Sequence, residues 1–166
     1  MSTKPSGELL RDIEIFREQD SATLDIIASQ MSLREYPVGE MVFREGDPGD
    51  ELFIVVKGRV AIFVSDQEGK DVSLAEVGAG SCFGEMSIID QTSRSAACRF
   101  LDDTVLLALH ADDFTRIIST MPDSAAKMMN RMLSIIVDRL MKTGAFVTQM
   151  VQYGELKTRT GGRHRY

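Results

Sequence analysis

The sequence predicts a mainly β protein with flanking helices: a jelly-roll-like β-barrel with N-terminal helices before it and a long C-terminal helix after it. Three observations support this fold class. The 166-residue chain is 43% hydrophobic, which is enough to bury one core. Residues 33–110 consist of short β-prone runs separated by turn residues. On both sides of that region, apolar residues recur at helical spacing.

The N-terminal helices are expected within residues 7–31. Asp20 or Ser21 can cap a helix, because either side chain can accept a hydrogen bond from a free backbone N–H of its first turn. The apolar face of that helix comprises Leu24, Ile27, Ala28 and Met31. A shorter amphipathic piece ahead of it comprises Leu9, Leu10, Ile13 and Phe16.

The barrel is expected within residues 33–110, as about eight short strands. Residues 52–56, 59–64 and 104–109 are the clearest apolar, β-prone runs. Turn-forming residues recur at roughly the 8–12-residue spacing of a sandwich or barrel. They comprise residues 37–39, 46–50, 57–58, 67–70, 78–80 and 101–103.

Residues 111–143 are expected to be helical again. Asp112 and Asp113 suit the positive N-terminal end of a helix dipole, and Pro122 suits the first position of a long helix running to about residue 142. The long helix is apolar over more of its circumference than one barrel face requires, which favours a second buried face. Two partners for that face stay open: a second copy of the chain, giving a homodimer through helix 122–142, or the chain's own N-terminal helices.

The composition favours a cytoplasmic protein without a metal site. No apolar run approaches the ~20 residues of a membrane span, and residues 1–5 lack a signal-peptide pattern. Cys82 and Cys98 lack metal-ligand spacing, so we expect them to be buried, reduced thiols. The two histidines, His110 and His164, are too few for the metal site of a cupin-type enzyme.

The charge distribution argues against nucleic acid as a partner. Residues 144–166 contain four Lys or Arg residues and one acidic residue, Glu155, which gives this segment a charge of +3. Because the whole chain has a net charge of −6, the remaining residues carry about −9, which would repel nucleic acid. This segment is expected to be a flexible tail, too short and glycine-broken for a DNA-binding domain. The expected domain therefore comprises residues 1–143.

The residues that carry chemistry lie between positions 83 and 97. Gly84 frees the backbone before a short helix, whose unpaired N–H groups and dipole favour an anion. Arg94 can donate two hydrogen bonds to a phosphate. Glu85 would repel a phosphate but can accept a hydrogen bond from a sugar hydroxyl. Together these residues favour a phosphate joined to a ribose.

Two stretches of the sequence resemble the cyclic nucleotide-binding domain family, which is shared by catabolite activator regulators, cyclic nucleotide-dependent kinases and gated channels. Residues 39–60 are similar to the start of that domain, and residues 83–96 to its phosphate-binding cassette. The resemblance spans about residues 10–142, with several motifs in the same order and spacing. It implies a barrel flanked by helices, with the nucleotide held between barrel and cassette helix.

The resemblance also implies roles for individual residues. Arg94 would bind the cyclic phosphate, Glu85 would accept from the ribose 2′-hydroxyl, and Ser95 would reach the phosphate. Ser93 replaces a proline that many members have, and removes no ligand group. The implied ligand-binding set comprises Gly84, Glu85, Met86, Ser87, Arg94, Ser95 and Ala96.

Recognition of the base is assigned in this family to the long C-terminal helix. Counting from Pro122 places Arg139, Leu140 and Thr143 near the base. Ser95 does not decide between cAMP and cGMP, because threonine at its position is associated with cGMP and alanine with cAMP. The expected ligand is therefore cAMP or cGMP, and no cofactor is expected.

The expected function is a stand-alone, non-enzymatic regulatory module that binds a cyclic nucleotide and signals through helix 122–142 to an unidentified partner chain. No serine–histidine or cysteine–histidine pairing is readable for nucleophilic catalysis, and ligands for a haem or iron–sulfur sensor are absent from the sequence. The alternative is a dimerising interaction scaffold that keeps the fold and has lost its ligand.

Overall fold

The computed structural model describes residues 4–160 of the chain. It divides into two compact units, Met1–Met132 and Leu133–Tyr166, and each is described by itself. The first unit contains every strand of the described residues, the cassette and the shorter helices. The second unit contains the greater part of the long C-terminal helix.

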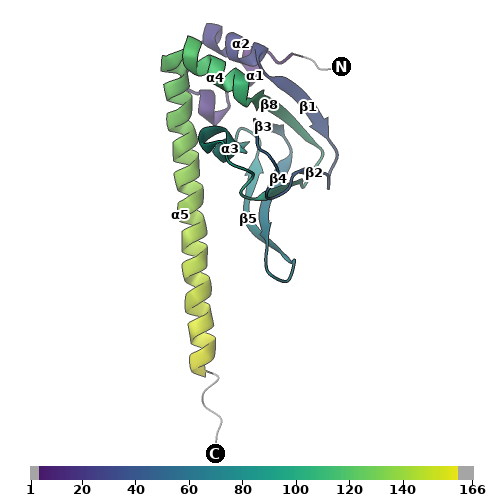
Figure 1. Ribbon diagram of the computed structural model, residues 1–166, viewed down its shortest axis with the longest axis vertical. Coiled ribbons are helices and arrows are strands. Elements are labelled where there is room, and N and C mark those ends of the chain that lie inside the picture. Colours follow the sequence, from purple (N-terminus) through teal and green to yellow (C-terminus); the bar gives the residue numbers. More distant parts are fainter. Residues whose placement is uncertain (1–3, 161–166) are drawn as a thin grey trace, which may run out of the picture. The chain divides into compact units, whose positions relative to one another are not determined.

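Eight strands in the described residues form two antiparallel four-stranded sheets (Figure 1). The first sheet has the order β1–β8–β3–β6, with bounds Ser32–Tyr36, Thr104–His110, Glu51–Lys57 and Cys82–Phe83. The second has the order β2–β7–β4–β5, with bounds Met41–Phe43, Ala97–Phe100, Arg59–Ser65 and Asp71–Gly78. This arrangement confirms the jelly-roll-like fold class, although the two sheets do not close into one continuous barrel.

The core of the first unit lies between the two sheets. Both contribute buried side chains to one cluster, which comprises Phe53, Val55, Val60, Val77, Phe83, Cys98, Phe100, Leu106 and Ala108. Cys82 and Cys98 are both buried, as expected. A tight turn at Gly58 joins β3 to β4 with φ +93°, and a Cβ there would lie 2.4 Å from Thr104 Oγ1. Only glycine therefore fits that turn.

The N-terminal helical region is broken into three pieces: α1 (Gly7–Leu10), a 3₁₀ turn (Glu14–Phe16) and α2 (Ser21–Ser29). Ile13 is extended between the first two pieces, and the N–H of Glu14 donates to Gly80 O at 3.1 Å. This bond to the β5–β6 turn explains why the expected amphipathic piece is not one continuous helix. Asp20 caps α2 by accepting from the N–H of Thr23 at 2.8 Å, which confirms the expected cap.

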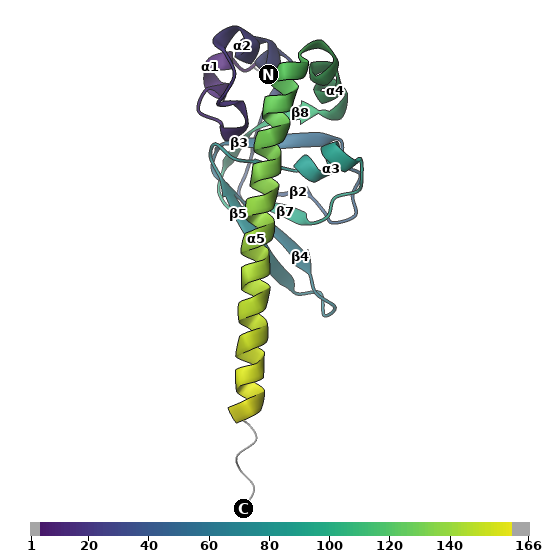
Figure 2. The ribbon, with the colours of Figure 1, turned by 90° about the vertical axis from the view of Figure 1, so that its left-hand side faces the viewer.

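Helices α4 (Ala111–Thr120) and α2 lie at the same end of the sheets in both views (Figures 1 and 2). Asp112 and Asp113 occupy the first turn of α4, as expected. His110 caps this helix, because its Nδ1 accepts from the N–H of Asp112 at 3.1 Å. The helices therefore close one end of the β-sandwich.

Helix α5 runs from Pro122 to Thr160, well beyond the end expected near residue 142. A lone glycine in a helix costs only about 1 kcal/mol relative to alanine, so Gly144 does not end it. Thr148 Oγ1 donates to Gly144 O at 3.0 Å, within the helix. Residues 144–160 of the expected tail are thus helical, and residues 161–166 lie outside the described residues.

The first turns of α5 pack within the first unit. Ala125, Met128 and Met132 are buried, and Gln19 Nε2 donates to Ser124 O at 3.0 Å. The helix also carries apolar side chains that stay exposed: Met129, Leu133, Val137, Leu140 and Met141. Part of the apolar surface of α5 is therefore buried within the chain, and part stays exposed to solvent.

Candidate functional site

The cassette is built around a six-residue helix, α3 (Glu85–Asp90), that begins directly after β6. Gly84 precedes it with a left-handed φ of +76°, and Gln91 ends it with φ +55°. A Cβ on Gly84 would lie 2.7 Å from Arg94 Nη1 and 3.1 Å from Glu51 O. Gly84 is therefore required both by its backbone conformation and by the arginine that lies against it.

Arg94 is directed inward and is only 5% exposed. Its Nη1 donates to Gly84 O at 3.1 Å, and its Nη2 donates to Glu51 O at 2.9 Å. Its Nε is buried and has no hydrogen-bond partner. Burial lowers the pKa of the guanidinium, and the nearby Cys98, Asp50, Glu51 and Glu85 act in the opposite direction. An arginine keeps its charge under such conditions, so the cassette holds a buried cation.

The remaining cassette residues fall into two groups. Glu85, Ser87 and Ala96 are buried, at 4%, 3% and 8% exposed. Met86 is 45% exposed, and Ser95 is exposed beside it, with Ser95 Oγ donating to Met86 Sδ at 3.7 Å. The structure thus places the acid, the serine of α3 and the arginine inside the cassette, and leaves Met86 and Ser95 on its surface.

The loop between α3 and β7 is tied to the loop between β2 and β3. The N–H of Arg94 donates to Asp47 O, and the N–H of Gly46 donates to Arg94 O, both at 2.8 Å. Gly49 lies so close to α3 that a Cβ there would be 2.3 Å from the Cβ of Ser87 and 3.1 Å from Arg94 Nε. The two sequence motifs that resemble the family are therefore in direct contact.

Three residues of this site were not singled out by sequence reasoning: Phe43, Gly49 and Glu51. The guanidinium of Arg94 lies 4.1 Å from the centre of the Phe43 ring. The carbonyl of Glu51 accepts a hydrogen bond from it, and Gly49 lies close to its Nε. All three are within the first family-like stretch, but their meeting with Arg94 depends on how the two sheets pack. The charge and size of single residues do not predict which distant segments come into contact when the sheets pack.

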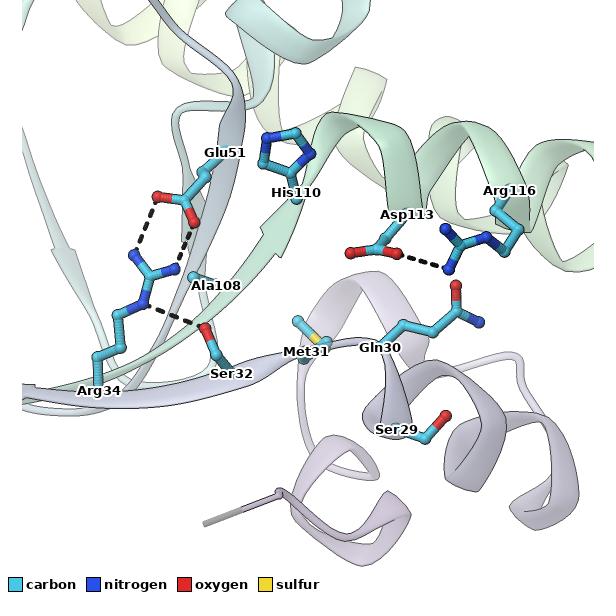
Figure 3. A pocket seen from close by; sticks show the side chains of 10 residues that line it. All are labelled: Ser29, Gln30, Met31, Ser32, Arg34, Glu51, Ala108, His110, Asp113 and Arg116. Atoms are coloured by element: carbon cyan, nitrogen blue, oxygen red, sulfur yellow. Dashed lines mark hydrogen bonds and ion pairs between the residues drawn. The ribbon is translucent and has the colours of Figure 1, made fainter. Parts of the chain in front are cut away.

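A pocket of about 410 Å³ lies between the end of α2, strands β1, β3 and β8, and α4 (Figure 3). It is lined by Ser29, Gln30, Met31, Ser32, Arg34, Glu51, Ala108, His110, Asp113 and Arg116. Both oxygens of Glu51 accept from Arg34, at 2.5 and 3.0 Å, and Asp113 pairs with Arg116 at 2.8 Å. Glu51 therefore belongs to both places: its carboxylate lines the pocket, and its carbonyl holds Arg94.

The residues expected near a base, Arg139, Leu140 and Thr143, all lie on the part of α5 that belongs to the second unit. Thr143 Oγ1 donates to Arg139 O at 2.9 Å, within the helix, and Leu140 is 69% exposed. Their approach to the cassette remains a prediction.

Within residues 4–160, no group of three or more His, Cys, Asp or Glu side chains is arranged to hold a metal ion. In the same part of the chain, no helix combines the length and apolar character of a membrane span.

Comparison with known proteins identifies the family and the fold. A family model described as "Cyclic nucleotide-binding domain" matches residues 33–121, which includes both family-like stretches. The chain is 31% identical over 136 residues to the cyclic AMP receptor protein of Thermus thermophilus, covering 82% of this chain and 61% of that protein. It is 34% identical over 118 residues to a cyclic nucleotide-gated potassium channel of Rhizobium etli, covering 71% of this chain and 32% of the channel.

The fold agrees with a solved structure, that of a cyclic nucleotide-binding domain from Methylobacillus flagellatus. The TM-score is 0.82 with 24% identity, over 90% of this chain and 88% of the other. At that identity the likeness concerns the fold alone. The chain spans less than two thirds of the length of the two relatives named above, so it matches only part of each.

Proposed function

The chain belongs to the cyclic nucleotide-binding domain family, and we propose that it is a non-enzymatic sensor in the cytoplasm that binds a cyclic nucleotide in the cassette between Gly84 and Ala96. The observation that carries the proposal is Arg94, a buried cation whose Nε has no partner. A buried N–H without an acceptor is unfavourable, and a phosphate oxygen would satisfy it with a charge-assisted bond.

The sugar and base would bind on either side of that phosphate. Buried Glu85, at the start of α3, suits the ribose 2′-hydroxyl, because an ionised carboxylate only accepts hydrogen bonds. The relative from Thermus thermophilus is named as a cyclic AMP receptor, so cAMP is the first ligand to test and cGMP the second. Arg139, Leu140 and Thr143 of α5 are proposed to cover the base.

The output of the sensor is proposed to pass through helix 122–142 to a second copy of the chain and then to a partner protein. The exposed apolar side chains of α5 support this proposal, since Met129, Leu133, Val137 and Leu140 recur every three to four residues. Ligand would change this contact only if it binds one arrangement of the helix more tightly than the other.

The deciding experiment identifies the ligand directly. Purified protein is denatured, any released nucleotide is identified by mass spectrometry, and nucleotide-free protein is titrated with cAMP and cGMP by calorimetry. Arg94→Ala should weaken binding about 10- to 150-fold, the value of the one hydrogen bond that the unpartnered Nε of a charged arginine can donate to a phosphate. Arg99→Ala is the matched control, because Arg99 is an exposed arginine of β7 that pairs with Asp71 at 3.4 Å. Unchanged affinity in Arg94→Ala would contradict the site.

A scaffold that dimerises without ligand is the second candidate, and the apolar stripe of α5 is the observation that favours it. Sedimentation of the nucleotide-free protein separates the two functions. Absence of any nucleotide from extraction and titration, together with a dimer that Leu133→Gln/Leu140→Gln dissociates, would favour the scaffold.

A further inference from the structure

Phe43 occupies an unusual place in the cassette, because its ring supports the guanidinium of Arg94. The centre of the ring is 4.1 Å from Arg94 Cζ, and the ring of Phe53 is 5.6 Å from it. Phe43 ends β2 in one sheet, and Phe53 lies in β3 of the other. Phe83, just before Gly84, completes a three-ring cluster, with centroids 5.3 to 6.1 Å apart. The arginine thus lies against an aromatic surface built from both sheets.

The edges of the same guanidinium are held by backbone carbonyls. Nη1 donates to Gly84 O and Nη2 donates to Glu51 O, while the ring of Phe43 lies against the flat face of the guanidinium. These three contacts fix both the position and the orientation of the group. Nε remains as a buried donor without a partner.

Arg94 makes no close ion pair, although the carboxylates of Asp50, Glu51 and Glu85 act on its charge from a longer distance. None of the ion pairs within 4 Å in the described part of the chain involves Arg94. Burial of an unpaired cation is unfavourable because the charge loses its hydration, and cation–π attraction to an aromatic face offsets part of that loss of free energy. A carboxylate in the same place would also stabilise the cation, but it would compete with the phosphate of a ligand. A ring does not compete.

We infer that Phe43 is a positioning residue for ligand binding: its ring holds the Arg94 guanidinium charged and oriented, with no carboxylate paired to it, before the ligand arrives. The inference rests on the proposed function of the cassette. Without the ring face, Arg94 would sample other rotamers, and the apparent affinity would fall with the fraction of molecules in the binding arrangement. Since a desolvated cation–π contact contributes about 1–2 kcal/mol, the expected loss in affinity is about 5- to 30-fold.

The test compares Phe43→Leu, Phe43→Tyr and a matched control, Phe63→Leu. Phe63 lies in β4 of the same sheet as Phe43, and its ring contacts Arg99 at 4.9 Å, so Phe63→Leu also removes a ring and a cation–π contact. Calorimetric titration with cAMP and cGMP gives affinity, and thermal denaturation gives stability. We expect Phe43→Leu to lose affinity 5- to 30-fold, whereas Phe43→Tyr and Phe63→Leu bind as the original protein does.

A second readout needs no ligand. The Nε–H resonance of Arg94 in a nitrogen–proton NMR spectrum, identified by its absence in Arg94→Lys, should be shifted upfield by the ring and should exchange slowly. Both properties should be lost in Phe43→Leu and kept in Phe43→Tyr. If the original protein binds no nucleotide, the proposed function fails, and the resonance still tests the positioning. An unshifted resonance, or equal losses of affinity in Phe43→Leu and Phe63→Leu, would overturn the inference.

Discussion

Gly49→Ala is the substitution whose effect follows most directly from the geometry of the cassette. The added Cβ would lie 2.3 Å from the Cβ of Ser87 and 2.4 Å from Ser87 Oγ. Unbonded carbon atoms pack at about 3.5–4.0 Å, so α3 or the β2–β3 loop would have to move by more than about 1 Å. Overpacking of this kind costs about 1–3 kcal/mol in stability.

The movement also reaches the ligand site, because the same Cβ would lie 3.1 Å from Arg94 Nε. The stability loss corresponds to a melting temperature lower by roughly 2–12 °C for a chain of this size. We expect the affinity for cyclic nucleotide to fall with it, since Ser87 and Arg94 are both displaced. Thermal denaturation without ligand and calorimetric titration measure the two effects separately.

Gly78→Ala is the matched control, because a Cβ at Gly78 would meet nothing within 4 Å and its φ is not positive. It should leave both the melting temperature and the affinity nearly unchanged. If Gly49→Ala melts at the same temperature as Gly78→Ala, then the close packing of the β2–β3 loop on α3 does not exist in solution and the reasoning fails.

Two further predictions concern single carboxylates. Glu85→Gln keeps one acceptor oxygen and loses the charge, so it should weaken cAMP binding about 5-fold. The analogue 2′-deoxy-cAMP, which lacks the hydroxyl, should bind this variant and the original protein equally well. If the variant also loses affinity for the deoxy analogue, Glu85 does not contact the ribose 2′-hydroxyl. Hydrogen bonds from Thr23 lower the pKa of Asp20, because they stabilise its ionised form. The ionised side chain therefore stabilises the fold above pH about 4, and this stabilisation is lost as the pH falls through the lowered pKa. The melting-temperature difference between the original protein and Asp20→Asn should therefore shrink below pH 4; a difference independent of pH would show that the charge of the cap is unimportant.

Much of the fold could be predicted because its signals are local. The apolar runs at 52–56, 59–64 and 104–109 became β3, β4 and β8, and Asp20 became the cap of α2. Each of these depends on a few neighbouring residues. The break at Ile13 and the continuation of α5 past Gly144 were not predicted. The first depends on a hydrogen bond to a distant turn, and the second on a balance of about 1 kcal/mol within the helix.

The site shows the same division. Gly84, Glu85 and Arg94 could be proposed as ligand-binding residues because their spacing along the chain resembles that of a known cassette. The packing of Phe43 against Arg94 could not, because it joins two segments that meet only when the sheets pack together. Sequence patterns thus led to a prediction of the ligand-binding residues, which stays a prediction, and the structure added how Arg94 is held.

The paired backbone hydrogen bonds between Arg94 and residues 46–47 have a consequence for the dynamics of the domain. The arginine both donates to and accepts from the β2–β3 loop, so neither loop can open without releasing the other. The two loops should therefore behave as one cooperative opening unit, in which the amides of Gly46 and Arg94 exchange with solvent at a common free energy. A phosphate bound to Arg94 would stabilise that whole unit, including residues it does not contact, and ligand binding would then lower the mobility of the adjoining β2–β3 loop.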